Sequence, residues 1–297
     1  MPSSRQEVGV GVLDGKVYVI GGFQDGQTVN TVERYDPVSN RWDEVDPLPA
    51  PLPLNHAAVA VVGSRLFVVG GLTQFFSPVD SLYCFDAEDE EWTEKASLPA
   101  ARGACAAAVI DGLIYAAGGF PSARRQDFAV YDPGADDWDP LPSMTAPRDH
   151  LAAAAVGGFF YAISGRSGGF NALRPEVERY DPSTRMWSNV RDIPTPRAGI
   201  AAAVVNGRIY VFGGEGNVNN PPTNTFLETE EYNPSTDEWR ELAPMPIGKH
   251  GIGAAAFDGK VYIPGGGPIE GIGDTDRNDV FTSPPLPTGA GSGWQVR

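Results

Sequence analysis

Residues 199–214 read GIAAAVVNGRIYVFGG, and this stretch decides the fold. Two short apolar runs flank Asn206-Gly207, a dipeptide typical of the two-residue turn of a β-hairpin because both turn positions need positive φ. Gly213-Gly214 ends the second run, at a place where Cβ atoms would block the close approach of another backbone segment. The stretch therefore predicts two antiparallel strands.

The residues that follow predict two more strands. After a loop, residues 229–238 read TEEYNPSTDE, and Trp239 comes next. Tyr232-Asn233-Pro234 ends a third strand in a turn, because proline presets φ at the second turn position. Trp239 then opens a fourth strand with a large apolar side chain. Four antiparallel strands thus form one unit.

This unit occurs six times. Gly-Gly pairs begin at Gly21, Gly70, Gly118, Gly213 and Gly265, and Ser164-Gly165 fills the remaining place. Two-residue turns lie at Asp14-Gly15, Gly63-Ser64, Asp111-Gly112, Gly157-Gly158, Asn206-Gly207 and Asp258-Gly259. Aromatic residues seven positions apart follow in five units: Tyr35/Trp42, Phe85/Trp92, Tyr131/Trp138, Tyr180/Trp187 and Tyr232/Trp239. Successive double-Gly positions are 46 to 52 residues apart.

A period near 50 with double Gly, Tyr and Trp resembles the kelch repeat. The resemblance covers essentially the whole chain and implies an all-β, six-bladed β-propeller in which each blade is a four-stranded antiparallel sheet. Residues 1–297 are expected to form one kelch propeller domain. Its blades are expected at residues 5–48, 54–98, 102–144, 148–193, 197–245 and 249–297.

Side-chain size indicates where each strand lies. The first strand of each repeat is rich in Ala, Gly and Val, which suit the crowded axis, whereas the Tyr and Trp residues would fill the wider gaps between blades. The sixth repeat departs from the pattern, with Phe281 and Trp294 thirteen positions apart. We expect Trp294 to supply the outer strand from the C-terminal side, and the ring to close by packing alone or with an N-terminal strand that is missing.

Composition excludes some classes of partner. The net charge of −16 argues against nucleic acid, because phosphate binding needs a basic surface. The longest apolar run, residues 151–163, is too short to span a membrane. Cys84 and Cys105 are expected to be unbridged. No signal peptide is visible, and the chain begins in the middle of the repeat pattern, so a cytoplasmic protein and a secreted protein whose leader has been removed are both compatible. A monomer is expected because the blades cover one another's faces.

Basic residues and histidines gather at one place in the pattern. Nine positions before each hairpin turn lie Arg5, Leu54, Arg102, Arg148, Arg197 and Lys249. Seven positions before it lie Glu7, His56, Ala104, His150, Gly199 and Gly251, and His250 lies eight before. On an extended strand, positions nine and seven back face the same side. We therefore predict a ligand-binding channel mouth lined by Arg5, Glu7, His56, Arg102, Arg148, His150, Arg197, Lys249 and His250.

Two hypotheses follow for this basic ring. In the first, the propeller is a binding module without chemistry that presents the mouth to an acidic protein segment or a small anion, held by charge-assisted Arg contacts. In the alternative, it is a sugar-acid mutarotase or epimerase, in which Arg102, Arg148 and Arg197 hold the carboxylate and His150 or Glu7 acts as acid or base. A structural role for the Arg residues, paired with the next blade, would produce the same pattern.

Metals and cofactors receive less support. Three histidines in alternate blades would suit zinc or copper, but they lack a local ligand spacing, and we expect no metal and no cofactor. Asp274, Asp276 and Asn278 resemble the start of a calcium loop, but Pro285 stands where the closing Glu should be, so a solvated turn is expected. This loop and the one beginning at Gly214 are the longest after a double Gly, and both are expected to overhang the same mouth.

The resemblance leaves the activity open, because kelch propellers include ubiquitin-ligase adaptors, actin-associated proteins, sialic acid mutarotases, nitrile specifier proteins and copper-radical galactose oxidases. We expect no helical domain of the adaptor kind, because the repeats occupy essentially all 297 residues. The chain also lacks the residue sets that galactose-oxidase and nitrile-specifier chemistry require.

Overall fold

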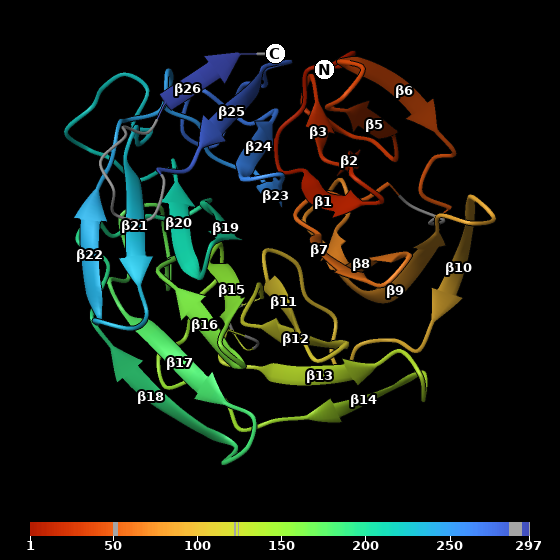
Figure 1. The fold of residues 1–297 in the computed structure, drawn as a ribbon, viewed down its shortest axis with the longest axis horizontal. Helices are drawn as coiled ribbons and strands as arrows, with labels where there is room; N and C mark the ends of the chain where they lie inside the picture. Colours follow the sequence, from red (N-terminus) through yellow and green to blue (C-terminus); the bar gives the residue numbers. More distant parts are fainter. Residues whose placement is uncertain (50–52, 122, 124, 285–292, 297) are drawn as a thin grey trace.

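Six four-stranded sheets surround a central axis in the computed structural model (Figure 1), which describes residues 1–49, 53–121, 123, 125–284 and 293–296. All the sheets are antiparallel, and the described residues contain no α-helix. The predicted six-bladed, all-β propeller is therefore confirmed. No described helix is long and apolar enough to cross a membrane.

In each blade the strands follow one another from the axis outward. The first three blades consist of β1 (Gly9–Leu13), β2 (Lys16–Ile20), β5 (Val32–Asp36) and β6 (Arg41–Val45); β7 (Ala58–Val62), β8 (Arg65–Leu72), β9 (Pro78–Asp86) and β10 (Glu91–Lys95); and β11 (Ala106–Ile110), β12 (Leu113–Ala117), β13 (Phe128–Asp132) and β14 (Asp137–Pro140). The last three consist of β15 (Ala152–Val156), β16 (Phe159–Ile163), β17 (Val177–Asp181) and β18 (Met186–Val190); β19 (Ala201–Val205), β20 (Arg208–Phe212), β21 (Thr229–Asn233) and β22 (Glu238–Glu241); and β23 (Ala255–Phe257), β24 (Lys260–Pro264), β25 (Asn278–Thr282) and β26 (Gly293–Val296). A small hairpin, β3 (Phe23–Gln24) with β4 (Gln27–Thr28), lies in the first blade's loop.

The register explains the sequence spacing. Val205 pairs with Arg208 across Asn206 and Gly207, which have φ of 52° and 72°, as the predicted hairpin turn requires. The aromatic residues seven apart are direct cross-strand partners, for example Tyr232 and Trp239. Phe281 pairs with Trp294 in the same way, so the sixth blade takes its outer strand from the C-terminal side as predicted.

Hydrophobic cores lie between neighbouring blades. The inner strands β1, β7, β11, β15, β19 and β23 contact one another in a closed ring. Six apolar clusters fill the gaps, one for each pair of adjacent blades, and the cluster between the last and first blades includes Val17, Tyr35 and Tyr262. Five of the tryptophans also donate their indole N–H to a backbone carbonyl of the preceding blade's outer segment, as Trp294 does to Ala243 at 3.0 Å. Aromatic side chains therefore join the blades, as predicted.

The ring closes by hydrogen bonds as well as by packing, which differs from the expectation of packing alone. The second residue of each double-Gly site donates its N–H to a backbone carbonyl of the next blade, and Gly266 closes the circle by donating to Arg5 at 2.8 Å. Packing is dense at the preceding position, because a Cβ on Gly213 would lie 2.5 Å from the carbonyl oxygen of Lys249. In blade four, Ser164 takes this place with φ of 51°, and its hydroxyl group donates to the Arg197 carbonyl at 2.8 Å. The N- and C-termini lie side by side in the first and last blades (Figure 1).

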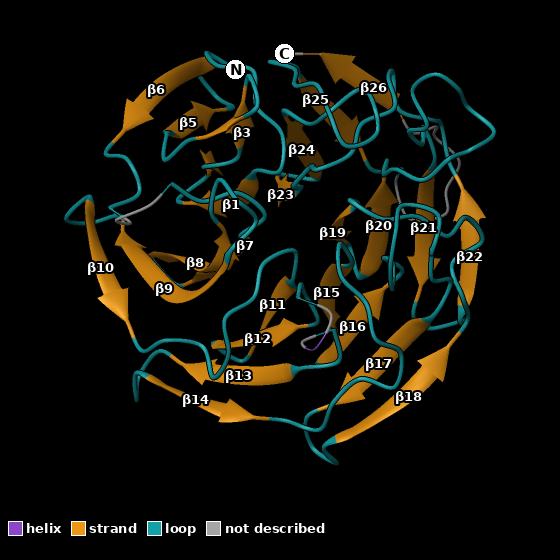
Figure 2. Ribbon diagram, turned by 180° about the vertical axis from the view of Figure 1, so that it is seen from behind, coloured by secondary structure: helices purple, strands orange, loops and turns teal. Residues whose placement is uncertain are grey.

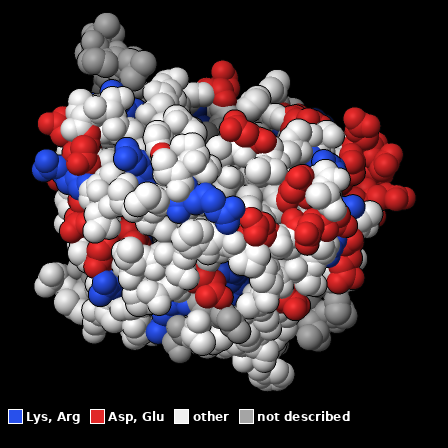
Figure 3. Space-filling view, turned by 90° about the horizontal axis from the view of Figure 1, so that it is seen from below, with Lys and Arg blue, Asp and Glu red and all other residues white. Residues whose placement is uncertain are grey.

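Charged side chains are unevenly distributed on the edge of the propeller that Figure 3 shows. In this view acidic side chains gather toward the right-hand side, whereas basic ones lie mainly at the centre and left. Cys84 on β9 and Cys105 before β11 are buried and unbridged, as predicted.

Candidate functional site at the channel mouth

The loops after the double Gly and the segments entering the inner strands meet at one end of the channel (Figure 2). An isolated bridge joins them in every blade: Gln6 to Phe23, Asn55 to Leu72, Gly103 to Phe120, Asp149 to Arg166, Ala198 to Glu215 and His250 to Gly267. The predicted meeting of these segments at one mouth is therefore confirmed. We call the described parts of residues 23–31, 73–77, 120–127, 166–176, 215–228 and 267–277 the mouth loops.

A closed ring of backbone hydrogen bonds forms the floor of the mouth. Its members are the residues seven positions before the hairpin turns, Glu7, His56, Ala104, His150, Gly199 and Gly251. The N–H of each residue donates to the carbonyl of its counterpart in the preceding blade, over 2.7 to 3.0 Å. All six have φ between 51° and 63°. We call this set the αL ring.

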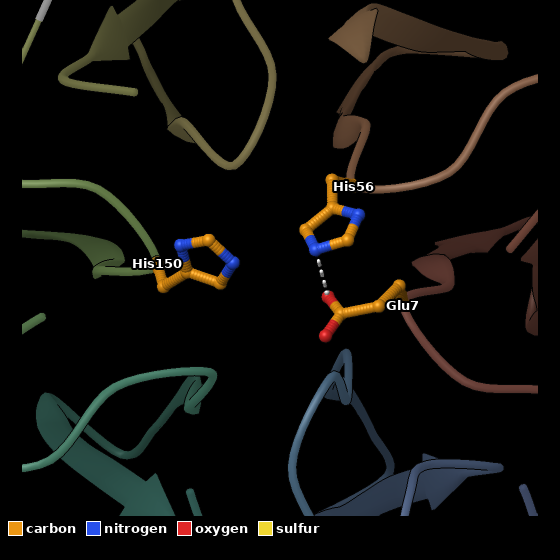
Figure 4. A group of neighbouring side chains, drawn as sticks. All are labelled: Glu7, His56 and His150. Atoms are coloured by element: carbon orange, nitrogen blue, oxygen red, sulfur yellow. Dashed lines mark ion pairs between the residues drawn. The ribbon is translucent and has the colours of Figure 1, made fainter. Parts of the chain in front are cut away.

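The positive φ of the αL ring changes which way the side chains face. Alternation along an extended strand predicts that positions nine and seven back point to the same side. Because position seven is left-handed, that alternation is broken. Glu7, His56 and His150 point toward one another at the mouth (Figure 4). The basic side chains at position nine are instead buried, and four of them pair with carboxylates of their own blades.

The predicted basic ring is therefore not at the surface of the mouth. Arg5, Arg102, Arg148, Arg197 and Lys249 are 0–1% exposed. Four of them form buried ion pairs with a carboxylate on the third strand of the same blade: Arg5 with Glu33, Arg148 with Glu178, Arg197 with Glu230 and Lys249 with Asp279. In blade two the corresponding positions are Leu54 and Tyr83, which belong to one apolar cluster. The partners lie in the same blade, not in the next one, and a ligand-binding role for these five residues stays a prediction.

Three of the other predicted residues come together. Glu7, His56 and His150 each offer a ligand atom within 4.8 Å of the other two (Figure 4). Glu7 Oε2 lies 3.2 Å from His56 Nε2, and the rings of His56 and His150 cross at 84° with centroids 5.0 Å apart. His250 is 1% exposed and lies beside them, with its Nε2 3.8 Å from Glu7 Oε1.

Hydrogen-bond partners fix the orientation of the three imidazoles. His56 Nδ1 lies 2.5 Å from Asn55 Oδ1, and His150 Nδ1 lies 2.6 Å from Asp149 Oδ1. His250 Nδ1 lies 2.9 Å from the Gly267 carbonyl oxygen. Each of these oxygens accepts, so each Nδ1 carries the proton and each neutral ring presents the lone pair of Nε2.

Burial determines the protonation states in the mouth. Desolvation, together with the charge of Glu215, raises the pKa of Glu7 to about 8. Desolvation also lowers the pKa of all three histidines, that of His56 to well below its usual value. At neutral pH the Glu7 carboxyl is therefore largely protonated and donates to His56 Nε2.

Charged residues that the sequence analysis missed complete the site. Arg166 donates to His150 Nε2 at 3.0 Å and to Glu215 Oε1 at 2.5 Å, and Arg125 donates to Asp149 at 2.5 Å. Arg166 and Glu215 directly follow the double-Gly sites of blades four and five, where the other blades have Phe23, Leu72, Phe120 and Gly267. A charged residue directly after a double-Gly site, where the other blades have an uncharged one, was the sequence signal that could have identified Arg166 and Glu215.

These groups line a cavity of about 310 Å³, which we call the mouth pit. Its walls include Phe23, Phe76 and Phe170, and the Arg166 guanidinium lies 4.7 Å from the centroid of the Phe170 ring. A larger hollow of about 510 Å³ lies beside β22, away from the mouth, and adjoins Pro284. The segment after Pro284, residues 285–292, is outside the described part of the chain. Glu7, His56 and His150 line the mouth pit, and they also line a smaller cavity of about 80 Å³ beside the αL ring.

Most of the exposed apolar side chains belong to the mouth loops, and two of them, Phe76 and Phe170, line the mouth pit. Of ten exposed large apolar residues in the described part of the chain, seven lie in the mouth loops: Phe75, Phe76, Phe170, Val218, Leu227, Ile269 and Ile272. We call these seven the apolar rim. The two longest loops touch, since the Glu270 N–H donates to the Thr223 carbonyl at 2.8 Å, and each contributes a residue to the mouth pit, Glu215 and Gly271.

The acidic loop between β24 and β25 is not a turn at residues 273–277, which differs from the expectation, because Thr275 forms a bridge with Arg5. Asp274 accepts a hydrogen bond from the Asp25 N–H at 2.8 Å, and Asn278 is buried at the start of β25. Pro285, which stands where a calcium loop would have its closing Glu, lies outside the described residues.

Comparisons with known proteins agree with this architecture. Residues 1–149, half of the chain, match the model of the KLHDC2/KLHL20/DRC7 Kelch-repeats domain, and residues 196–246 match that of the Kelch motif. The chain belongs to the kelch-repeat family.

Two kelch-like proteins and one solved structure are similar to this chain. The kelch chain is 31% identical to Kelch-like protein terF of Aspergillus terreus, over 95% of its own length and 65% of that protein. It is 34% identical to Kelch-like protein 35 of Mus musculus, over 41% of its own length and 20% of that protein. The chain thus spans about two thirds of the first relative and a fifth of the second. A solved structure described as that of YjhT has the same fold, with a TM-score of 0.81, 13% identity, and coverage of 99% and 98% of the two chains.

Proposed function

We propose that this kelch propeller binds a protein segment across its mouth, with the apolar rim as the contact surface and the mouth pit receiving an acidic side chain of the segment. The observation that carries the proposal is the presence of seven of the ten exposed large apolar residues of the described chain on the mouth loops, two of which, Phe76 and Phe170, line the mouth pit. Exposed apolar patches bordered by polar residues are typical of protein interaction surfaces.

The acidic preference rests on the two cations of the mouth pit. The side chains of Arg125 and Arg166 are 16% and 11% exposed, whereas the predicted ring is buried. Both cations contact carboxylates, Arg125 that of Asp149 and Arg166 that of Glu215. An incoming carboxylate would accept charge-assisted hydrogen bonds from the remaining N–H groups of these two guanidinium groups.

The test is selection of peptides from a displayed library on the full chain. The rim variant combines Phe75→Ser, Val218→Ser and Ile272→Ser, three side chains that are 88%, 60% and 62% exposed and are therefore replaceable without harm to the core. A control combines Val38→Ser and Met186→Ser, which are 87% and 66% exposed and lie outside the mouth loops.

Selected peptides are expected to contain Asp or Glu beside apolar residues. Their affinity should fall at least about tenfold for the rim variant, corresponding to about 1.4 kcal/mol, and remain unchanged for the control. Peptides that bind the rim variant as tightly as the wild type would contradict the proposal.

A second candidate, a small-molecule site for a sugar acid, is favoured by the proximity of Glu7 and His150, whose ligand atoms lie within 4.8 Å of each other in a cavity of about 310 Å³. A carboxyl with raised pKa and an imidazole held by Asp149 are groups suited to acid–base chemistry during ring opening. Arg166 would hold the carboxylate in place of Arg102, Arg148 and Arg197. The test is a thermal shift with sugar acids on wild type and Arg166→Gln, followed by NMR measurement of anomer exchange. A ligand at 100 times its dissociation constant should stabilise the wild type by about 2.7 kcal/mol, and the absence of any shift would contradict this candidate.

A further inference from the structure

We propose that Glu7, His56 and His150 form a binding site for a divalent transition-metal ion of the zinc type, with His250 as an additional ligand. This departs from the expectation of no metal that the sequence suggests, and it does not depend on the protein partner. The three groups offer ligand atoms within 4.8 Å of one another, although they come from three different blades. Two imidazoles and a carboxylate, with a position left open, are a ligand set that zinc uses.

The hydrogen bonds around the imidazoles resemble the outer shell of a metal site. A metal-binding histidine usually donates its second N–H to a carboxylate or carbonyl, which fixes the ring and its tautomer. Asn55 and Asp149 provide such acceptors for the Nδ1 atoms of His56 and His150. Both acceptors are 1% exposed. The Nε2 atoms therefore carry the lone pairs, and an ion would replace Glu7 as the partner of His56 and Arg166 as the partner of His150.

His250 supplies an independent observation. Its Nε2 is buried and makes no hydrogen bond to the described residues, although it lies 3.8 Å from Glu7 Oε1 and 3.5 Å from Glu215 Oε2. A buried nitrogen without a hydrogen bond is costly unless something pairs with it. Its Nδ1 faces the Gly267 carbonyl, so its orientation matches that of the other two histidines.

The backbone holds the ligands in place before an ion arrives. Glu7, His56 and His150 belong to the αL ring, in which each N–H donates to the preceding blade. The mouth pit is lined by these same three residues and gives an ion a route to them. Imidazole nitrogen suits zinc, copper, iron and nickel, whereas magnesium and calcium prefer oxygen ligands.

Arg166 opposes the ion in the structure as it stands, because its guanidinium donates to His150 Nε2 at 3.0 Å. Its other partner, Glu215 at 2.5 Å, can retain it when an ion takes His150. We therefore expect Arg166→Gln to increase the affinity for the ion, a gain that a misfolded variant would not produce.

The test is titration of the chelator-treated full chain with Co²⁺, followed by the visible absorption of the bound ion, and then displacement by Zn²⁺. The variants are His56→Asn and His150→Asn, since asparagine tolerates the positive φ of 53° at both positions. The matched control is Ala104→Asn, which changes the same αL-ring position, with φ of 51°, in a blade without a ligand.

The wild type and the control should bind one Co²⁺ with equal affinity, and each His variant should bind at least on the order of tenfold more weakly, the loss expected even when an outer-shell partner is removed. Arg166→Gln should bind more tightly than the wild type. Failure of the wild type to bind Co²⁺, or wild-type affinity in both His variants, would overturn the proposal. The second result would place the ion on the acidic surface instead.

Discussion

Single backbone positions set the distance between blades. At the first double-Gly position of five blades, a Cβ would lie 2.3 to 2.6 Å from a carbonyl oxygen of the next blade. The same residues have positive φ, so both the conformation and the close approach favour glycine. These two causes can be separated by mutation.

Gly213→Ala is expected to destabilise the protein more than Gly207→Ala. Both residues have positive φ, 55° and 72°, but only the Cβ at position 213 would meet a backbone atom, whereas nothing lies within 4 Å of one at position 207. The conformational cost alone should be about 1–2 kcal/mol for Gly207→Ala. Urea unfolding measures both, and equal losses would show that close approach to Lys249 is unimportant.

The buried ion pairs make a second prediction at this scale. Arg197→Leu leaves Glu230 charged and buried, and is expected to cost about 3–5 kcal/mol. The double variant Arg197→Leu/Glu230→Gln removes the stranded charge and should lose clearly less, just as blade two accommodates Leu54 opposite Tyr83. Thermal unfolding of both variants is the measurement. A double variant as unstable as the single one would contradict a structural role for the pair.

Turns between the third and fourth strands connect neighbouring blades. Asp136 accepts hydrogen bonds from the Tyr131 hydroxyl at 2.6 Å and from the Ala96 N–H of the preceding blade at 2.9 Å. Asp237 accepts from Tyr232 at 2.7 Å and from the Arg191 N–H at 2.8 Å in the same manner. The first blade uses Asn40 in this place, with Tyr35 donating at 2.7 Å. A charged and a neutral acceptor thus occupy the same structural position.

These turns predict a pH dependence below the usual aspartate range. The backbone hydrogen bond from Ala96 lowers the pKa of Asp136, and at Asp237 burial opposes the hydrogen bonds, yet the pKa is lowered overall. Because the folded pKa lies below the unfolded one near 3.9, their stabilisation is complete above that value and is lost as the pH falls through the folded pKa. Asp136→Asn/Asp237→Asn should therefore show a smaller fall in Tm than the wild type between pH 6 and roughly pH 3. Equal falls would show that these carboxylates do not contribute.

At the scale of the whole molecule, the repeat predicted the architecture but not the site. Six copies of one unit specify blades, hairpins and aromatic pairs, because each copy has a two-residue turn and a double-Gly site or its Ser-Gly equivalent, and five of them have an aromatic pair seven positions apart. Counting alternate positions could not place Arg148 and Arg197 inside their blades, although a structural role was one of the alternatives, because His150 and Gly199, two residues further along, have positive φ. Counting alternate positions assumes an extended backbone.

The charged part of the mouth pit follows from closure of the ring. Arg166 and Glu215 meet because blades four and five are neighbours and the residues after their double-Gly sites face the same pit. His56 and His150 come from blades two and four, and meet across the αL ring. Such contacts depend on the radius of the ring, which no single repeat encodes.

The central claim is that the mouth is the binding surface, and hydrogen–deuterium exchange with and without a selected peptide tests it most directly. We expect added protection in the mouth loops, above all at residues 73–77, 166–176 and 215–228, with the outer strands β6, β10, β14 and β18 unchanged. Protection confined to those outer strands, with mouth loops that exchange as in the free protein, would contradict the account.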